Sequence, residues 1–351
     1  MTENFQNTFS VPLPLVLPGM TQISVPALVS AVSKAGALGL LATAALTPEE
    51  VERSIKEVRR LCKATFGVGI PLLLPDAKEK VAAAVRCKVP VVNFSLGKGD
   101  WLIDEVHAYG GKVIATVTTE KHAQAAVRAG ADALLVTGHE AAGHGSSVSS
   151  LVLVPKLARE FDVPIIAAGG FSDGFGLAAA LTLGADAVAM GSRFAMTKES
   201  PLHPDSKRAV QERSIDQTLS TDKFDGMDCR IMVSPASHRL IQEKPSILAA
   251  FRAAHEQSTR TAISRWTLYR RVLLKGPRHV LRMARMADAG DAMRRALCDG
   301  DHQTGIQPIG QGMGLIDDVP DVNSLVARIM REACSRAETI SHDLAQHPMQ
   351  T

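Results

Sequence analysis

The sequence predicts an α/β fold, a (β/α)8 TIM barrel with an additional small α-helical domain. Up to about residue 195, an apolar strand-like run is repeatedly followed by an amphipathic, alanine-rich helix-like run. Eight strands can be counted, and they are continuously apolar, which indicates burial on both faces. Such units favour a closed barrel. An open doubly wound sheet stays as the alternative, because the number of strands can be read from a sequence more easily than whether they close into a barrel.

The expected elements follow one another with short connections. The strand-like runs are LPLVLPG (13–19), LGLLAT (38–43), FGVGIPLLL (66–74), VPVVNFS (89–95), KVIATVTT (112–119), ADALLVTG (131–138), VPIIAAGG (163–170) and AVAMGSRF (187–194). Between them, the helix in TPEEVERSIKEVRRLC has Thr47 as its N-cap and Glu50 in position for a capping box. Two other helices end on glycine, in VHAYGG and AVRAGA, which is the usual C-terminal signal.

The character of the chain changes after about residue 198. The polar stretch KESPLHPDSKRAVQERS leads into long helical patterns without evident strand alternation. We therefore expect a barrel over 1–200, a helical substrate-covering domain over 201–304, and a closing loop with a last helix over 305–351. The arginines of the helical part form either a solvated helix face or a dock for an anionic substrate or acidic carrier. They are Arg252, Arg260, Arg265, Arg270, Arg271, Arg278, Arg282, Arg285, Arg294 and Arg295.

Composition narrows the class of protein. The net charge of +3 is too balanced to argue for nucleic acid or a membrane surface as partner. No apolar run approaches the roughly 18–20 residues that span a bilayer, and the N-terminal residues have no signal-peptide core. The five cysteines are scattered, so we expect free thiols in a reducing cytoplasm and no zinc site. A cytoplasmic protein with a small-molecule substrate is expected, and a homodimer is left open.

Glycine-rich loops follow the seventh and eighth strands, where barrel enzymes often bind phosphate. Gly169 and Gly170 lack a Cβ, so their backbone can approach a phosphate closely. Ser172 or Asp173 can cap the next helix, whose N-terminal amides attract anions. Gly191 and Ser192 follow the eighth strand and add donors. A phosphorylated cofactor is predicted; the alternative is that these glycines only make tight turns. No GxGxxG follows the first strand, and no P-loop motif occurs.

The stretch GHEAAGHGSS (138–147) follows the sixth strand on the same rim. Its histidines are five apart, about 140° around a helix, and not the four apart of a zinc-protease motif. We therefore expect a loop and no metal. A neutral imidazole there can take a carbon-bound proton or stabilise a developing anion, which makes His144 the catalytic candidate. Glu140 could hold the loop through backbone amides, and His139 is interpreted as structural.

Two long segments resemble one known family. ADALLVTGHEAAGHGS and VPIIAAGGFSDGFGLAAALTLGADAVAMGSRF resemble the nitronate monooxygenase (2-nitropropane dioxygenase) family, whose members are FMN-dependent (β/α)8 enzymes with a small helical domain. The opening LPLVLPGMTQISVPALVSAVSKAGALGLL and the later GQGMGLIDD are similar to the family's N-terminal pattern and closing loop. The resemblance spans most of residues 11–320.

The resemblance implies that FMN is the cofactor and that its phosphate lies near the two glycine loops. It also implies a flavin near Met20, covered by the closing loop, and it makes His144 the catalytic residue. The expected cofactor-binding residues are Pro18, Gly19, Met20, Gly69, Thr116, Glu140, Gly143, Ala168, Gly169, Gly170, Met190, Gly191, Ser192, Gln311 and Gly312. The sequence departs from the family pattern at three of these places. The first-strand segment reads PGM (18–20), where the family commonly has APM or GGM. Gly69 stands where the family often has an asparagine, and Thr116 stands near a lysine that some NADH:quinone reductases carry.

The expected reaction is therefore the FMN-dependent oxidation of alkyl nitronates by O2 to a carbonyl compound and nitrite. The alternative is an NAD(P)H-dependent FMN reductase acting on enoyl thioesters or quinones, which an arginine-rich layer would suit because a thioester carrier is acidic. A barrel that only binds a ligand is the third reading. O2 or NAD(P)H would be the co-substrate in the first two.

Overall fold

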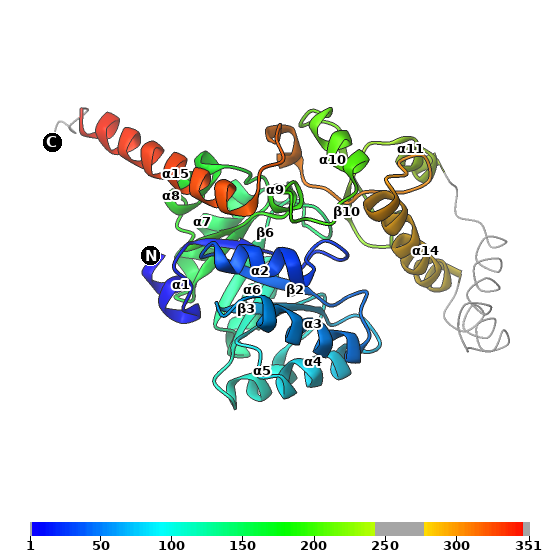
Figure 1. Cartoon of the computed structure of the whole chain (residues 1–351), viewed down its shortest axis with the longest axis horizontal. Coiled ribbons are helices and arrows are strands. Elements are labelled where there is room, and N and C mark those ends of the chain that lie inside the picture. The colour runs from blue at the N-terminus through cyan, green and yellow to red at the C-terminus, as the bar shows by residue number, and fades with distance from the viewer. Residues whose placement is uncertain (1, 243–276, 347–351) are drawn as a thin grey trace.

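A computed structural model describes residues 2–242 and 277–346, and its centre is a closed barrel of eight parallel strands (Figure 1). The strands pair in chain order, and the first pairs with the last, through Leu15 with Val188 and Val16 with Ala189. This closure confirms the predicted barrel and excludes the open sheet. The strands are β1 (Leu15–Leu17), β2 (Leu38–Ala42), β3 (Phe66–Pro71), β4 (Val91–Ser95), β5 (Lys112–Val117), β6 (Ala133–Thr137), β7 (Ile165–Ala168) and β8 (Ala187–Ala189).

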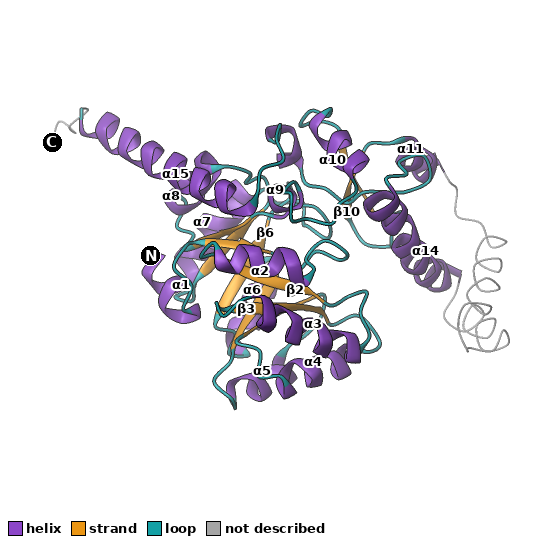
Figure 2. Cartoon of the chain, in the orientation of Figure 1, coloured by secondary structure: helices purple, strands orange, loops and turns teal. Residues whose placement is uncertain are grey.

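Helices cover the outside of the barrel, as Figure 2 shows. They are α2 (Pro26–Lys34), α3 (Pro48–Leu61), α4 (Ala77–Arg86), α5 (Asp100–His107), α6 (Glu120–Arg128), α7 (Ser150–Glu160) and α8 (Gly174–Thr182). The capping box expected at α3 is present: Thr47 Oγ1 accepts from Glu50 N, and a Glu50 carboxylate oxygen accepts from Thr47 N at 2.8 Å. The glycines expected to end α5 and α6 have positive φ, 83° at Gly110 and 98° at Gly130.

The first helix, α1 (Thr2–Phe9), closes one end of the barrel. Its buried Phe5 and Phe9 have ring centroids 5.1 Å apart and belong to the same apolar cluster as the inward-facing strand residues, such as Val16 and Leu38. A second cluster, formed by the outward-facing strand residues, packs against the helices. Since α1 occupies the end where β1 begins, the open end is the one where the strands terminate. That end is where barrel enzymes place their sites.

After β8 the chain contains both helices and strands. Its elements are α9 (Gly191–Ala195), α10 (Pro204–Gln211), β9 (Thr218–Thr221), β10 (Cys229–Met232), α11 (Pro235–Gln242), α14 (Pro277–Asp299), the 3-10 helix η1 (Gln311–Leu315) and α15 (Val322–Ala345). The antiparallel pair β9–β10 makes the expectation of a wholly helical segment wrong. The sequence hides this hairpin because β10 is buried at all four residues, so no polar and apolar alternation marks it.

The division into three domains stays a prediction. Five of the arginines proposed as an anion dock lie outside the described residues, namely Arg252, Arg260, Arg265, Arg270 and Arg271. Arg294 is exposed and pairs with Asp299, at 2.8 Å. Among the helices of the described ranges, none is long and apolar enough to cross a membrane.

The last helix, α15, packs along α8, and its C-terminal part extends past the barrel (Figure 1). The contact depends on Gly174, the first residue of α8. A Cβ at this position would overlap Glu332 Cβ and the Ile329 carbonyl oxygen, and it would lie 2.6 Å from Ala333 N. Gly174 N also donates to the Glu332 carboxylate, at 2.9 Å. The two helices therefore fit together only where the side chain is a hydrogen atom.

Gly174→Ala is expected to lower the free energy of unfolding by about 1–3 kcal/mol, because the added methyl group forces α15 away from α8. Urea denaturation followed by circular dichroism measures it. The matched control is Gly290→Ala in α14, where a Cβ meets nothing within 4 Å. That control should stabilise slightly, by about 0.5–1 kcal/mol, since alanine is the better helix former. Equal midpoints for the two variants would show that α8 and α15 separate without cost.

Candidate active site

The loop after β6 lies at the open end of the barrel, and its first residues are fixed to their neighbours. Gly138 N donates to the carbonyl of Ala168 at the end of β7, at 2.9 Å, and His139 N donates to Val148 O, at 2.8 Å. The Glu140 carboxylate accepts from Ser150 N at the start of α7, at 2.9 Å. This segment is therefore a loop and not a helix, as its glycines predicted.

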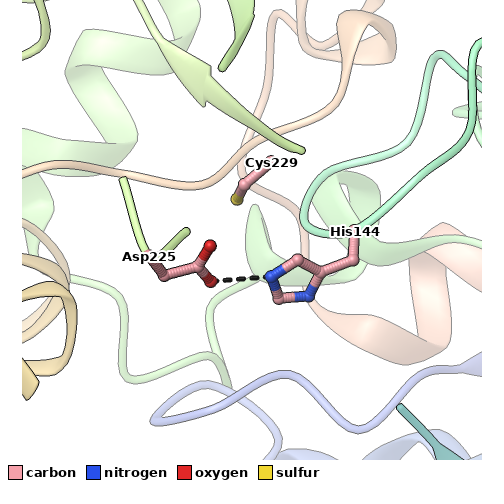
Figure 3. Close-up of side chains that lie close together, drawn as sticks. All are labelled: His144, Asp225 and Cys229. Carbon is pink, nitrogen blue, oxygen red and sulfur yellow. Dashed lines mark hydrogen bonds and ion pairs between the residues drawn. The ribbon is translucent and has the colours of Figure 1, made fainter. Parts of the chain in front are cut away.

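His144 lies in that loop and faces an aspartate from the β9–β10 turn (Figure 3). Its Nε2 is 2.6 Å from Asp225 Oδ2, and the two side chains are 27% and 13% exposed. A carboxylate accepts, so Nε2 of the neutral ring carries the hydrogen and Nδ1 keeps a lone pair. Among the residues that the structure describes, no hydrogen bond occupies Nδ1. The pair is an oriented imidazole with a free nitrogen that can take up a proton.

Cys229, the first residue of β10, lies beside this pair. One nitrogen of His144, one carboxylate oxygen of Asp225 and Sγ of Cys229 all lie within 4.8 Å of one another. Burial raises the pKa of the Cys229 thiol well above its usual range, with the Asp225 charge adding to the effect. The sulfur is therefore a neutral thiol in the resting protein.

The other histidine of the loop, His139, is held by a buried arginine. Arg230, 5% exposed, donates through Nη2 to His139 Nε2 at 2.7 Å and through Nε to the His139 carbonyl at 3.0 Å. Since arginine can only donate, Nδ1 of His139 carries the ring hydrogen and donates to Ser146 O, at 3.0 Å. Arg230 also bonds Thr218 Oγ1, and its own amide donates to Gly143 O. Burial lowers the pKa of the Arg230 guanidinium from its ordinary value. One side chain thus joins the His144 loop to the hairpin.

The two predicted phosphate loops meet the predicted closing loop. Gly310 N donates to Ser192 Oγ, at 3.2 Å, and Ser172 Oγ donates to the carbonyl of Gly312, at 2.9 Å. Gln311 N donates to the Glu140 carbonyl, at 2.9 Å. The closing loop therefore binds to all three loops that follow β6, β7 and β8.

The backbone of the first phosphate loop requires glycine. Gly169 and Gly170 have φ of 105° and 82°, a region that other residues rarely adopt. At the adjoining start of α8, Asp173 is the cap, since its Oδ1 accepts from Gly176 N at 2.8 Å. Gly174 N is occupied by Glu332, at 2.9 Å. With two of the helix amides already bonded to carboxylates, the glycine loops are the better place for a phosphate.

Around the rim, small residues from distant strands come together. A Cβ at Gly191 would lie 3.3 Å from Met20 Sδ and 3.7 Å from Pro18 Cγ. A Cβ at Gly19 would lie 3.2 Å from the Cα of Gly69. The predicted residues of β1, β3 and β8 are therefore neighbours in space. Ala168 and Met190 are buried at the ends of β7 and β8, and Gly143 has φ of 70°.

Asn93 on β4 lies among the predicted site residues, and sequence reasoning missed it. It is paired in register with Gly69, and its Oδ1 lies 3.8 Å from the position of a Cβ on that glycine. Its Nδ2 donates to Thr116 Oγ1 at 2.9 Å and to Ile114 O at 3.1 Å. A side-chain amide therefore lies on the fourth strand beside Gly69, the position where the family often has an asparagine. The signal was a lone asparagine within the apolar run VPVVNFS.

The sequence is similar to one protein family and to individual relatives that carry two different names. The family described as nitronate monooxygenase matches residues 3–87 and 75–332. A Rhodococcus jostii protein named (3aS,4S,5R,7aS)-5-hydroxy-7a-methyl-1-oxo-octahydro-1H-indene-4-carboxyl-CoA dehydrogenase is 33% identical over 93% of this chain and 94% of its own. A probable nitronate monooxygenase of Bacillus subtilis is 31% identical over 66% of this chain and 80% of its own.

Two solved structures are similar to this chain over nearly its whole length. FabK of Thermotoga maritima superposes with a TM-score of 0.80 at 32% identity, and the match covers 96% of this chain and 97% of FabK. A nitroalkane oxidase of Streptomyces ansochromogenes superposes with a TM-score of 0.76 at 26% identity, covering 96% and 99%. The whole architecture, barrel and added layer together, is thus shared with these proteins.

Proposed function

The chain belongs to the nitronate monooxygenase family, and on that premise we propose that it is an FMN-dependent oxidoreductase whose substrate is a coenzyme A thioester. That it is an oxidoreductase of this family follows from the match over nearly the whole chain. The thioester rests on one observation. A relative that covers 93% of this chain at 33% identity is named as a carboxyl-CoA dehydrogenase.

The residues at the barrel rim fit a flavin mononucleotide. Gly169 and Gly170 have positive φ and no Cβ, so their backbone can approach a phosphate closely, and Gly191 leaves room beside Met20. The buried Asn93 amide and Thr116 hydroxyl offer polar groups at the ends of β4 and β5. When bound, the flavin supplies the exchange of a hydride or of single electrons with the substrate.

In this proposal His144 transfers the substrate proton. A thioester carbonyl acidifies the carbon next to it, and Nδ1 of His144 can remove a proton from that carbon while Asp225 stabilises the imidazolium. In the reverse direction, the same nitrogen returns the proton to the α-carbon. Hydride leaves or enters at the neighbouring carbon, so the balance is one proton and one hydride per double bond formed or reduced.

Nitronate oxidation is the second candidate, because the family description and the Streptomyces neighbour both point to nitro compounds. The chemistry asked of His144 is related: a nitro group also acidifies its α-carbon, and an imidazole can remove that proton or orient the resulting anion. The Bacillus relative with this name matches only 66% of the chain, which is why the thioester is placed first.

Anaerobic reduction of the bound flavin separates the candidates. The purified yellow protein is mixed in parallel with a saturated alicyclic carboxyl-CoA, its free acid, an alkyl nitronate, NADH and NADPH. The proposal expects rapid bleaching by the thioester and none by the free acid. Reoxidation of NADH-reduced enzyme by the matching α,β-unsaturated thioester would support the same site working in reverse. Bleaching by the nitronate alone would replace the thioester by the second candidate, and a flavin inert to every donor would sink both.

A further inference from the structure

His144, Asp225 and Cys229 form a compact donor set that the proposed reaction does not explain in full. Asp225 and Cys229 come from the β9–β10 hairpin, and His144 comes from the loop after β6 (Figure 3). Their donor atoms lie within 4.8 Å of one another, Cys229 is buried, and the Asp225 side chain is only 13% exposed. An imidazole and a carboxylate suffice to move a proton. The thiol adds a soft ligand, and imidazole, carboxylate and thiolate together are the ligands that Zn²⁺ takes in proteins.

We propose that His144, Asp225 and Cys229 bind a thiophilic divalent cation such as Zn²⁺, and that the bound ion reversibly inhibits the enzyme. Metal binding itself is independent of the reaction catalysed. Only the inhibition rests on the proposed function, because it requires His144 to be the proton acceptor.

The geometry needs only small side-chain movements. Zinc–ligand bonds of about 2.0–2.3 Å put the donors of a tetrahedral site roughly 3.3–3.6 Å apart. His144 and Asp225, now 2.6 Å apart, would separate by less than one bond length, and the Cys229 sulfur would approach them. The thiol proton leaves to solvent as the sulfur binds. The chain supplies three ligands, so the fourth position is left for water or a substrate atom.

Metal and proton transfer exclude each other at this histidine. An ion at Nδ1 uses the lone pair that accepts the substrate proton. An ion at Nε2 breaks the bond to Asp225 and moves the ring hydrogen to Nδ1, so the lone pair is again lost. Either way the imidazole no longer acts as a base, and inhibition follows without any change in the flavin.

The ion would also join two segments of the chain. The loop of His144 and the hairpin are already bridged where Gly143 pairs with Arg230, next to Cys229. A ligand that binds only the folded protein raises its unfolding midpoint. Zn²⁺ is therefore expected to raise the melting temperature of the flavin-loaded protein, and Mg²⁺, which prefers oxygen ligands, is not.

The test is competition for Zn²⁺ between the flavin-loaded protein and a chromophoric chelator, with Cys229→Ser, Asp225→Asn and the surface control Cys298→Ala. The proposal expects one ion per native chain and per control chain, and affinity roughly 100-fold weaker in Cys229→Ser. Within each variant that turns over, activity with and without Zn²⁺ is compared. Inhibition should be reversed by EDTA and should follow the measured affinity. If Cys229→Ser does not fold, Asp225→Asn decides the ligand assignment.

Zinc that binds equally well to Cys229→Ser and Asp225→Asn, or that is lost in Cys298→Ala, would overturn the site. Tight binding that leaves turnover of the native enzyme unchanged would overturn the inhibition. A protein that oxidises no thioester or nitronate but still binds one Zn²⁺ through Cys229 would refute the proposed function and leave the metal site standing.

Discussion

Replacing His144 by alanine is expected to lower turnover by roughly 100- to 10,000-fold while FMN stays bound, because the proposed mechanism uses His144 as its proton acceptor and assigns it no contact with the cofactor. Single-turnover mixing with substrate under anaerobic conditions measures the rate of flavin bleaching directly. The flavin spectrum of the purified variant reports whether the cofactor is retained.

The matched control is His122→Ala, since His122 is an exposed histidine on α6, on the outside of the barrel. It should leave both the rate and the flavin content unchanged. If His144→Ala turns over like the native enzyme, His144 has no part in the mechanism. If it loses FMN, the residue supports the cofactor instead.

Arg230→Met is expected to cost about 2–3 kcal/mol of stability and to slow turnover, although methionine fills much of the same space. Replacing a buried charge by an apolar group can be neutral when the partners go with it. Here the partners stay: the His139 carbonyl, His139 Nε2 and Thr218 Oγ1 each lose their donor. Unpaired polar atoms at a buried site carry the larger penalty, so destabilisation should win. Denaturant unfolding and turnover measure the two effects.

Arg230→Lys is the control for charge. A lysine keeps the positive charge but lacks the planar fork of donors, so it can replace only part of the contacts and should fall between the native protein and Arg230→Met. A methionine variant that is more stable than the native protein and fully active would show that the guanidinium is not what positions the His144 loop.

The barrel could be predicted because each of its strands carries a local signal. Continuous apolar runs mark strands buried on both faces, and caps such as Thr47 mark where helices begin. The hairpin β9–β10 was missed because its strands are four residues long and one is buried throughout, which leaves no period to read.

Some residues of the candidate site could be predicted from the sequence, and others could not. The glycine loops after β7 and β8 can be recognised in the sequence, since positive φ and close approach of the backbone to its neighbours both require glycine. The sequence does not mark Asp225, Cys229 and Arg230 as site residues. They meet the His144 loop only when the hairpin folds onto a segment some eighty to ninety residues earlier in the chain. Whether the predicted flavin contacts form stays a prediction, and the assays above address it.

The order in which the ribosome delivers this chain has a consequence for how it matures. All eight strands have been synthesised by residue 189, so the nascent barrel can close early. The bonds that clamp its glycine loops come from Gly310, Gln311 and Gly312, and α8 is covered by a helix that starts at Val322. A chain released before these residues would contain all eight barrel strands but would lack the bonds that hold the glycine loops in place. A flavin bound at these loops, as we propose, would be enclosed only after the closing loop had been synthesised.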